Sequence, residues 1–233
     1  MALTEPDDVR PRVVVLLAAA RGADDLEAAL VAARSGFPSD VELRLGIRHE
    51  QDPMALMMGE RGASEPVDGV IEVTLPDGVP LSNCAAAVDG LAATLGGAID
   101  AARSAVVAGT CYRFLHAGGS VFAAIAARRA PGTTMDQLTE WWLHQHGPLA
   151  LRIVSPPPLA YEQLHGDADM SRAAARAAGV SETPYDMYDT IGAPTLEEFE
   201  QAAGDPAVAA QLFEDEVGHV DHSSFRGAIQ RTL

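Results

Sequence analysis

The sequence predicts an α+β fold made of two consecutive units, each with the element order βαββαβ. Two observations lead to this prediction. The same order of apolar runs, capping signals and turns occurs twice, and residues 1–118 and 119–233 carry similar formal charges of −8 and −9. A unit of this order forms a four-stranded antiparallel sheet with both helices on one face. The bare face of each sheet then needs cover, which a second copy supplies by packing sheet to sheet or by closing a barrel.

The composition excludes several classes of protein. The chain has 233 residues, of which 48% are hydrophobic, and a formal charge of −17. It can therefore bury a sizeable core, but it has no basic stripe that would bind nucleic acid or an anionic membrane surface. All 16 basic residues are Arg, which excludes Schiff-base lysine chemistry, pyridoxal phosphate and a P-loop lysine. Any catalysis is therefore expected to use His, Tyr and carboxylate groups.

The N-terminal residues do not predict a signal peptide, because acidic side chains stand where a basic segment would be needed. The apolar run at 13–20 is too short to cross a bilayer. Cys84 and Cys111 have no CxxC spacing, so we expect two buried free thiols. These observations predict a soluble cytoplasmic protein with no membrane partner.

The elements of the first unit, residues 1–118, follow from apolar runs bounded by turn signals. Asp24 with Glu27 three residues later predicts a helix N-terminus of the capping-box kind, and Ser82 predicts the start of a long Ala-rich helix. The expected order is a strand at 13–20, a helix at 24–34, strands at 41–49 and 69–75, a helix at 82–103 and a strand at 105–115.

The second unit, residues 119–233, repeats this order. Thr134 with Gln137 predicts a capping box, and Gly147 with Pro148 predicts the end of that helix. An Ala-rich stretch at 166–183 is expected as an insertion. The expected order is a strand at 121–127, a helix at 134–146, strands at 159–165 and 186–192, a helix capped by Thr195 and Glu198, a helical stretch at 205–216 and a strand at 225–232.

The helix at 134–146 carries a candidate catalytic histidine. Leu138, Trp142 and His146 lie at i, i+4 and i+8, so they share the buried face, whereas His144 points to water. His146 also stands near the expected helix C-terminus, where the helix dipole favours the imidazolium. We interpret His146 as a general acid or base. The alternative is a core histidine that caps a carbonyl group of its own helix.

The strand at 159–165 carries three further candidates. Strand alternation places Tyr161, Gln163 and His165 on one face. Three hydrogen-bonding side chains in a row suit the wall of a polar cavity. The alternative is a sheet face exposed to solvent. A second unit argues against this alternative, because its sheet would cover the face.

A third group lies near the C-terminus. Glu216, His219 and His222 could share a helical face as a two-His, one-carboxylate metal site, but Gly218 weakens such a helix. We therefore favour an acidic helix end with solvated histidines and expect no metal. Asp221 beside His222 is a candidate for orienting an imidazole.

Other signals are weaker. The sequence contains no GxGxxG, HExxH or Walker pattern, so a nucleotide cofactor is not expected. Met54, Met57 and Met58 predict a mobile loop, with an adaptable apolar mouth as the alternative.

Three separated motifs in residues 119–233 resemble the EthD domain family. The first looks like the W-x-x-x-H-x-P-L pattern of that family, the second like its Y-x-Q-x-H strand and the third like its D-E…V-D-H-S ending. In this chain they are Trp142, His146, Pro148 and Leu149; Tyr161, Gln163 and His165; and Asp215, Glu216 and residues 220–223. The helix at 24–34 has no such motif at its end, so residues 1–118 are expected to be a degenerate copy.

The resemblance implies tandem ferredoxin-like units that form an α+β barrel around a small-molecule cavity, a pseudo-dimer within one chain. It also implies links to ether degradation or to cofactor-free decarboxylation and dehydration in polyketide pathways. A homodimer of the whole chain is left open.

The leading hypothesis is a lyase without a cofactor that acts on a small aromatic or polyketide-like compound. Its expected catalytic residues are His146, His165 and Tyr161. The expected substrate-binding residues are Gln163, Trp142, His222 and Asp221. A non-catalytic accessory protein that binds a hydrophobic metabolite is the second hypothesis. The third is a heme protein with His146 or His165 as the axial ligand.

Overall fold

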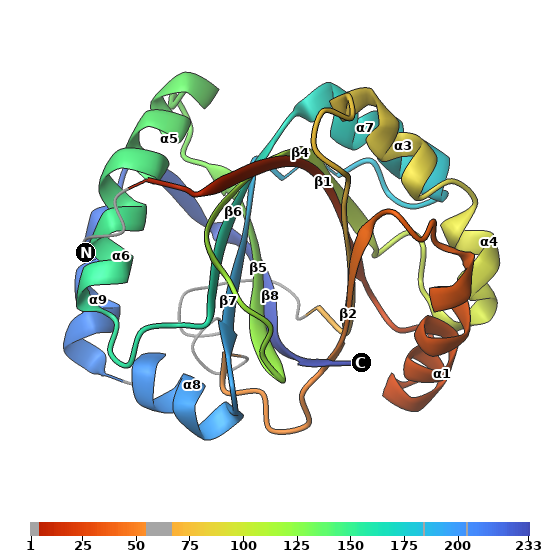
Figure 1. Ribbon diagram of the computed structural model, residues 1–233, viewed down its shortest axis with the longest axis horizontal. Helices are drawn as coiled ribbons and strands as arrows, with labels where there is room; N and C mark the ends of the chain where they lie inside the picture. The colour runs from red at the N-terminus through yellow and green to blue at the C-terminus, as the bar shows by residue number, and fades with distance from the viewer. Residues whose placement is uncertain (1–4, 55–66, 184, 204) are drawn as a thin grey trace.

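The strands form a closed antiparallel barrel with helices on its outside (Figure 1). The computed structural model describes residues 5–54, 67–183, 185–203 and 205–233. The α+β barrel class is therefore confirmed. Its strands are β1 (Asp8–Leu17), β2 (Glu42–Arg48), β3 (Gly69–Thr74), β4 (Ala105–His116), β5 (Val121–Arg129), β6 (Ala160–Gly166), β7 (Met187–Ala193) and β8 (Val220–Thr232).

The strand order divides the barrel into two quartets. Around the barrel the order is β1-β3-β2-β8-β5-β7-β6-β4, and β4 closes onto β1. Each quartet therefore has its fourth, first, third and second strand side by side, which is the order of a ferredoxin-like sheet. Two seams join the quartets: β4 pairs with β6 over seven residue pairs, and β2 pairs with β8 over three. The division into units 1–118 and 119–233 stays a prediction.

Helices cover the outer face of each quartet (Figure 1). Over the first quartet lie α1, α3, α4 and α7, and over the second lie α5, α6, α8 and α9. The helices are α1 (Ala23–Ala33), α3 (Cys84–Ala87), α4 (Leu91–Leu95), α5 (Met135–Trp141), α6 (Gly147–Ile153), α7 (Ala168–Ala178), α8 (Leu196–Ala203) and α9 (Pro206–Glu216). The short turns are the 3₁₀ segments η1 (Arg34–Gly36), η2 (Leu81–Asn83) and η3 (Gly96–Ala98) and the π-helical η4 (Trp142–His146).

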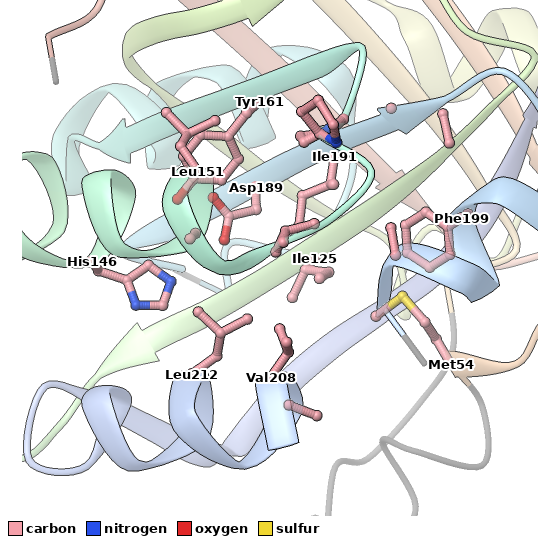
Figure 2. A pocket seen from close by; sticks show the side chains of 18 of the residues that line it. Met54, Ile125, His146, Leu151, Tyr161, Asp189, Ile191, Phe199, Val208 and Leu212 are labelled. Atoms are coloured by element: carbon pink, nitrogen blue, oxygen red, sulfur yellow. The ribbon is translucent and has the colours of Figure 1, made fainter. Parts of the chain in front are cut away.

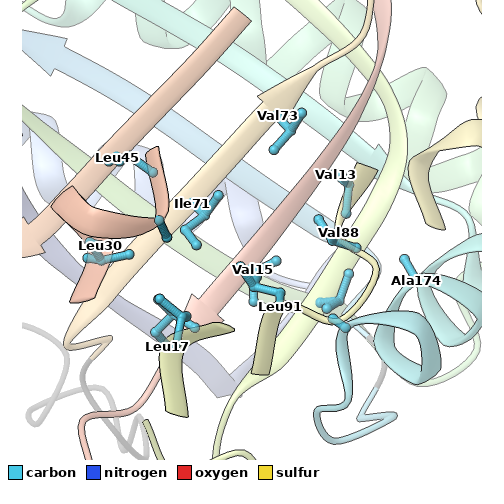
Figure 3. Packing of buried hydrophobic residues seen from close by; sticks show 14 of the residues in the cluster. Val13, Val15, Leu17, Leu30, Leu45, Ile71, Val73, Val88, Leu91 and Ala174 are labelled. Atoms are coloured by element: carbon cyan, nitrogen blue, oxygen red, sulfur yellow. The ribbon is translucent and has the colours of Figure 1, made fainter. Parts of the chain in front are cut away.

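On the outer face of the first quartet, apolar side chains pack against the covering helices (Figure 3). Val13, Val15 and Leu17 of β1 point outward, where they meet Leu30 of α1 and Leu91 of α4. The expected insertion contains α7, and its Ala174 joins this cluster. Helix α7 therefore belongs to the second half of the chain but covers the first.

The barrel interior holds apolar side chains from both quartets. These include Val14 and Leu16 of β1, Phe122 of β5, Leu164 of β6 and Ala228 of β8. Strand alternation explains the arrangement, since the odd-numbered neighbours on β1 face the helices and the even-numbered ones face inward.

A buried ion network occupies one part of the interior. The Glu162 carboxylate accepts hydrogen bonds from Arg12 at 2.7 Å, Arg44 at 3.1 Å and Arg113 at 3.0 Å. Glu72 accepts from Arg44 at 2.8 Å and from the hydroxyl of Tyr188 at 2.6 Å. The arginines lower the pKa of Glu162 against the opposing effect of burial. The carboxylate is thus ionised, and each of its oxygens has a cationic partner.

Several predicted local features are wrong. The expected helix at 82–103 is broken, because Gly90 and Gly96 adopt left-handed backbone conformations with φ of 68° and 57°. Asp24 is not an N-cap: Gly22 takes that position, and no side chain caps α1. Gly147 and Pro148 do not end a helix, because α6 continues from η4 with Pro148 in its first turn, where a missing N–H is tolerated.

The capping box of Thr134 and Gln137 is confirmed, as are two buried free thiols at Cys84 and Cys111. Among the described residues, every helix is too short or too polar to traverse a lipid bilayer.

The ion network predicts that Glu162→Gln strongly destabilises the protein. The substitution removes the negative charge that faces the buried Arg12 and Arg113 and the partly buried Arg44. We therefore expect a loss of about 3–5 kcal/mol in the free energy of unfolding, measured in urea. Glu182 forms an exposed pair with Arg176 at 2.8 Å, and Glu182→Gln should cost less than about 1 kcal/mol. Equal effects of the two substitutions would contradict a structural role for the network.

Candidate functional site

A cavity of about 450 Å³ lies between the outer face of the second quartet and its helices (Figure 2). This size is in the range of small-molecule sites. The resemblance implied a cavity that the two units face, which the structure corrects: the space between the quartets is filled by the apolar cluster and the ion network. The walls are mainly apolar and include Ile125, Leu151, Ile191, Phe199, Val208 and Leu212.

His146 lines this cavity from η4. The capping box starts the helix, and Leu138, Trp142 and His146 all face inward and are buried, as predicted from their spacing. The helix passes through a π-helical turn at this point, in which the Gly147 N–H bonds to the Trp142 carbonyl oxygen. His146 therefore lies within a continuing helix, so the predicted effect of a helix C-terminus on it is wrong. Single π-helical turns occur frequently at functional sites.

A carboxylate orients the His146 ring. Nδ1 of His146 lies 2.9 Å from Oδ2 of Asp215, which stands in the last turn of α9. The ring also packs against Trp141, with 4.9 Å between the ring centroids. With Nδ1 held by the carboxylate, Nε2 is the nitrogen available to exchange a proton with a bound molecule.

Tyr161 lines the cavity from β6, and Gln163 holds its hydroxyl group from behind. The Gln163 amide Nε2 donates to the Trp142 carbonyl oxygen at 3.1 Å and to the Tyr161 hydroxyl oxygen at 2.9 Å. The predicted shared face of Tyr161, Gln163 and His165 is confirmed by these contacts and by the Gln163–His165 contact at 3.4 Å. Because the tyrosine oxygen accepts this bond, its own proton stays free for a ligand.

His165 does not line the described cavity. It lies behind the wall, where it stacks on Trp142 with 4.5 Å between the ring centroids. Its Nδ1 is 3.1 Å from the Thr139 hydroxyl, and its Nε2 faces Oε1 of Gln163. A carbonyl oxygen accepts only, so the Gln163 NH₂ must face Trp142 and its oxygen must face His165. The proton of His165 therefore sits on Nε2.

Asp189 is the residue that the sequence analysis missed. It lies on β7 between Met187 and Ile191, and all three line the cavity. Its Oδ1 is buried and has no hydrogen-bond partner among the described residues. Burial and the negative charge of Glu216 raise the pKa of Asp189 well above its ordinary value. The sequence does contain one indication of this site: strand alternation places Asp189 on the same face as the apolar Met187 and Ile191.

The remaining predicted site residues lie outside the cavity wall. Trp142 is fully buried behind it, and Trp141 lines the cavity in its place. Asp221 lies on β8, where its carboxylate accepts hydrogen bonds from the backbone N–H and the hydroxyl group of Ser223. The histidine pair does not share a helix, because α9 ends at Glu216 and His222 lies on β8.

His222 still contacts the site through a lining residue. Its Nε2 is 2.8 Å from Oε2 of Glu216, which faces the cavity. Within the described ranges, no group of three or more His, Cys, Asp or Glu side chains is arranged to hold a metal ion. Met54 also lines the cavity, whereas Met57 and Met58 lie outside the described residues.

Comparisons with known proteins agree with this fold. The EthD domain family matches residues 130–223, and no curated protein sequence matches the chain. An anthrone oxidase-like protein superposes with a TM-score of 0.60 at 10% identity, over 98% of this chain and 93% of the other. A mutant chlorite dismutase from Candidatus Nitrospira defluvii gives a TM-score of 0.51 at 10% identity, over 100% and 93% of the two chains. At this identity the similarity shows the fold alone.

The contact between η4 and Gln163 predicts that Gly147→Ala disturbs the site. A Cβ atom at Gly147 would stand 2.8 Å from Gln163 Nε2 and 3.1 Å from the Trp142 carbonyl oxygen. We expect a loss of about 1–3 kcal/mol in the free energy of unfolding from this overpacking. At Gly118 nothing lies within 4 Å of such an atom, so Gly118→Ala should leave the free energy of unfolding nearly unchanged. Thermal unfolding of both variants measures the two effects. A neutral Gly147→Ala would rule out the tight contact.

The setting of His165 predicts an imidazole that stays neutral in mildly acidic solution. Burial lowers the pKa of His165 to about 3. Imidazole NMR should show the Nε2-protonated tautomer unchanged between about pH 7 and pH 5. The stability that neutral His165 contributes is present above its unfolded pKa of about 6.5 and is lost as the pH falls towards 3. A doubly protonated ring at pH 5 would refute this assignment.

Proposed function

Because residues 130–223 match the EthD domain family, we propose that this chain is an enzyme that processes a small, largely apolar molecule in the cavity beneath α5, α6, α8 and α9. The chemistry that the residues support is acid–base catalysis without a cofactor, of the lyase type. The observation that carries the proposal is the 2.9 Å contact between His146 Nδ1 and Asp215 Oδ2 at the wall of a mainly apolar cavity.

The pair of His146 and Asp215 supplies a general base. The carboxylate fixes the ring orientation and stabilises the imidazolium that forms when Nε2 takes a proton. The surrounding apolar walls exclude water, which strengthens each electrostatic interaction inside the cavity. Tyr161 supplies a neutral hydroxyl donor, since burial raises its pKa well above the ordinary value.

The aromatic side chains of the cavity wall support an aromatic substrate. In this chain the cavity offers flat or broad apolar surfaces from Trp141, Phe199 and Phe225. One histidine could serve either reaction: as the base that removes a C–H proton in a dehydration, or as the acid that protonates the carbanion left by loss of CO₂ in a decarboxylation.

The described lining residues do not fit a heme group. The two propionates of heme need cationic partners, but the described part of the lining includes no Arg, and Asp189 and Glu216 face the same space. His165, one of the two expected axial ligands, lies behind the wall. We derive no step from heme.

The proposal predicts that His146→Gln lowers turnover by at least about a hundredfold, because it removes the proton acceptor. Turnover is measured by mass spectrometry on a panel of aromatic hydroxyketones and aromatic acids, as loss of water or of CO₂. His144 is on the same helical turn but is exposed, so His144→Gln serves as the matched control and should keep full activity. Ligand binding without turnover in the native protein would instead identify a carrier.

A further inference from the structure

We propose that Tyr161 and Asp189 together bind the carbonyl oxygen of the substrate as a pair of hydrogen-bond donors, so that the ligand is a neutral aromatic ketone. This inference rests on the proposed function and names its substrate class. It follows from the placement of the two side chains, from their hydrogen-bonding state and from the charges around them.

The strand register places the two groups side by side. On the adjacent strands β6 and β7, Gln163 pairs with Asp189 and Tyr161 pairs with Ile191. Tyr161 and Asp189 are therefore diagonal neighbours on the same face, a separation that an aromatic side chain spans. Figure 2 shows the Asp189 carboxyl group and the hydroxyl end of Tyr161 on the same side of the cavity as His146.

Both groups are available as donors. The Tyr161 oxygen accepts from Gln163 at 2.9 Å, which leaves its proton for a ligand. Asp189 Oδ1 is buried without a partner in the described part of the chain, and a buried polar atom of this kind needs one. In its neutral form the Asp189 carboxyl group donates a hydrogen bond, and its raised pKa favours that form. A neutral carboxylic acid can serve as such a donor beside a tyrosine.

The charges around Asp189 oppose an anionic ligand. Glu216 faces the cavity from α9 and Glu198 from α8, and His146 faces it from η4. No Arg is among the described lining residues. A substrate carboxylate would therefore meet acids without a fixed cation, which disfavours decarboxylation and favours loss of water from a neutral molecule.

The elimination balances with one base and two donors. His146 Nε2 takes the proton from the carbon next to the carbonyl group, and the electron pair of the broken C–H bond forms an enolate. Tyr161 and Asp189 stabilise the enolate oxygen. The enolate then expels the hydroxyl group on the β carbon, which leaves as water with the proton returned by His146. One C–H bond and one C–O bond break, and one C=C bond forms.

The test uses three probes of the same size class: 2-acetonaphthone, 2-naphthoate and naphthalene. We expect the ketone to bind at least about tenfold more tightly than the carboxylate, and its C=O infrared stretch to fall on binding. Tyr161→Phe and Asp189→Leu should each reduce that shift and weaken ketone binding by about tenfold. Naphthalene has no oxygen, so unchanged naphthalene binding shows that the cavity of each variant is intact.

The pH dependence separates the two donors. Ketone binding to the native protein should weaken as the pH rises through the pKa of Asp189, because the ionised group no longer donates. Asp189→Asn keeps a donor that does not titrate, so its ketone affinity should be independent of pH. Equal binding of ketone and carboxylate, or a C=O stretch unaffected by both substitutions, would overturn the inference. Turnover that still depends on His146 would then leave the proposed function standing.

Discussion

The carboxylate of Glu162 joins the two halves of the barrel through three charged hydrogen bonds. It stands on β6 and binds Arg12 of β1, Arg44 of β2 and Arg113 of β4, so one strand of the second quartet is tied to three strands of the first. The neighbouring residues on β6, Tyr161 and Gln163, point the opposite way and build the cavity wall. Strand alternation thus connects the charged interior to the site, because any shift of β6 along its neighbours would displace both sets of groups.

Periodicity and capping predicted most of the fold because they are local. The strand alternation of β6 was readable from seven residues, and the capping box of α5 from four. The contact of Arg12 with Glu162 joins residues 150 positions apart, and such a pair depends on the barrel register, which a single sequence does not reveal. The continuation of the helix past Gly147 was missed for another reason. After the π-helical turn η4, Pro148 lies in the first turn of α6, so the Gly-Pro pair that was expected to end a helix stands where the next helix begins.

The candidate site was predicted in part. His146 and Tyr161 were found because spacing places them on defined faces, and both line the cavity. His165 shares the face of Tyr161 but sits four residues further along β6, beneath α5, where Thr139 and Trp142 cover it. Sequence spacing gives the face of a strand but not where a cavity on that face ends. Asp189 was missed because a single acidic residue on a strand does not indicate a site unless the side chains around it in space are known to be apolar.

The unequal seams of the barrel have a consequence for its motions. The seam of β4 and β6 has seven residue pairs and carries the Glu162–Arg113 bond, whereas that of β2 and β8 has three pairs near the end of the chain. Local opening follows the least stabilised backbone hydrogen bonds, so we expect the seam of β2 and β8 to open before that of β4 and β6. The wall that bears Tyr161 therefore belongs to the more extensively paired seam, whereas Phe225 brings β8 of the shorter seam to the same cavity.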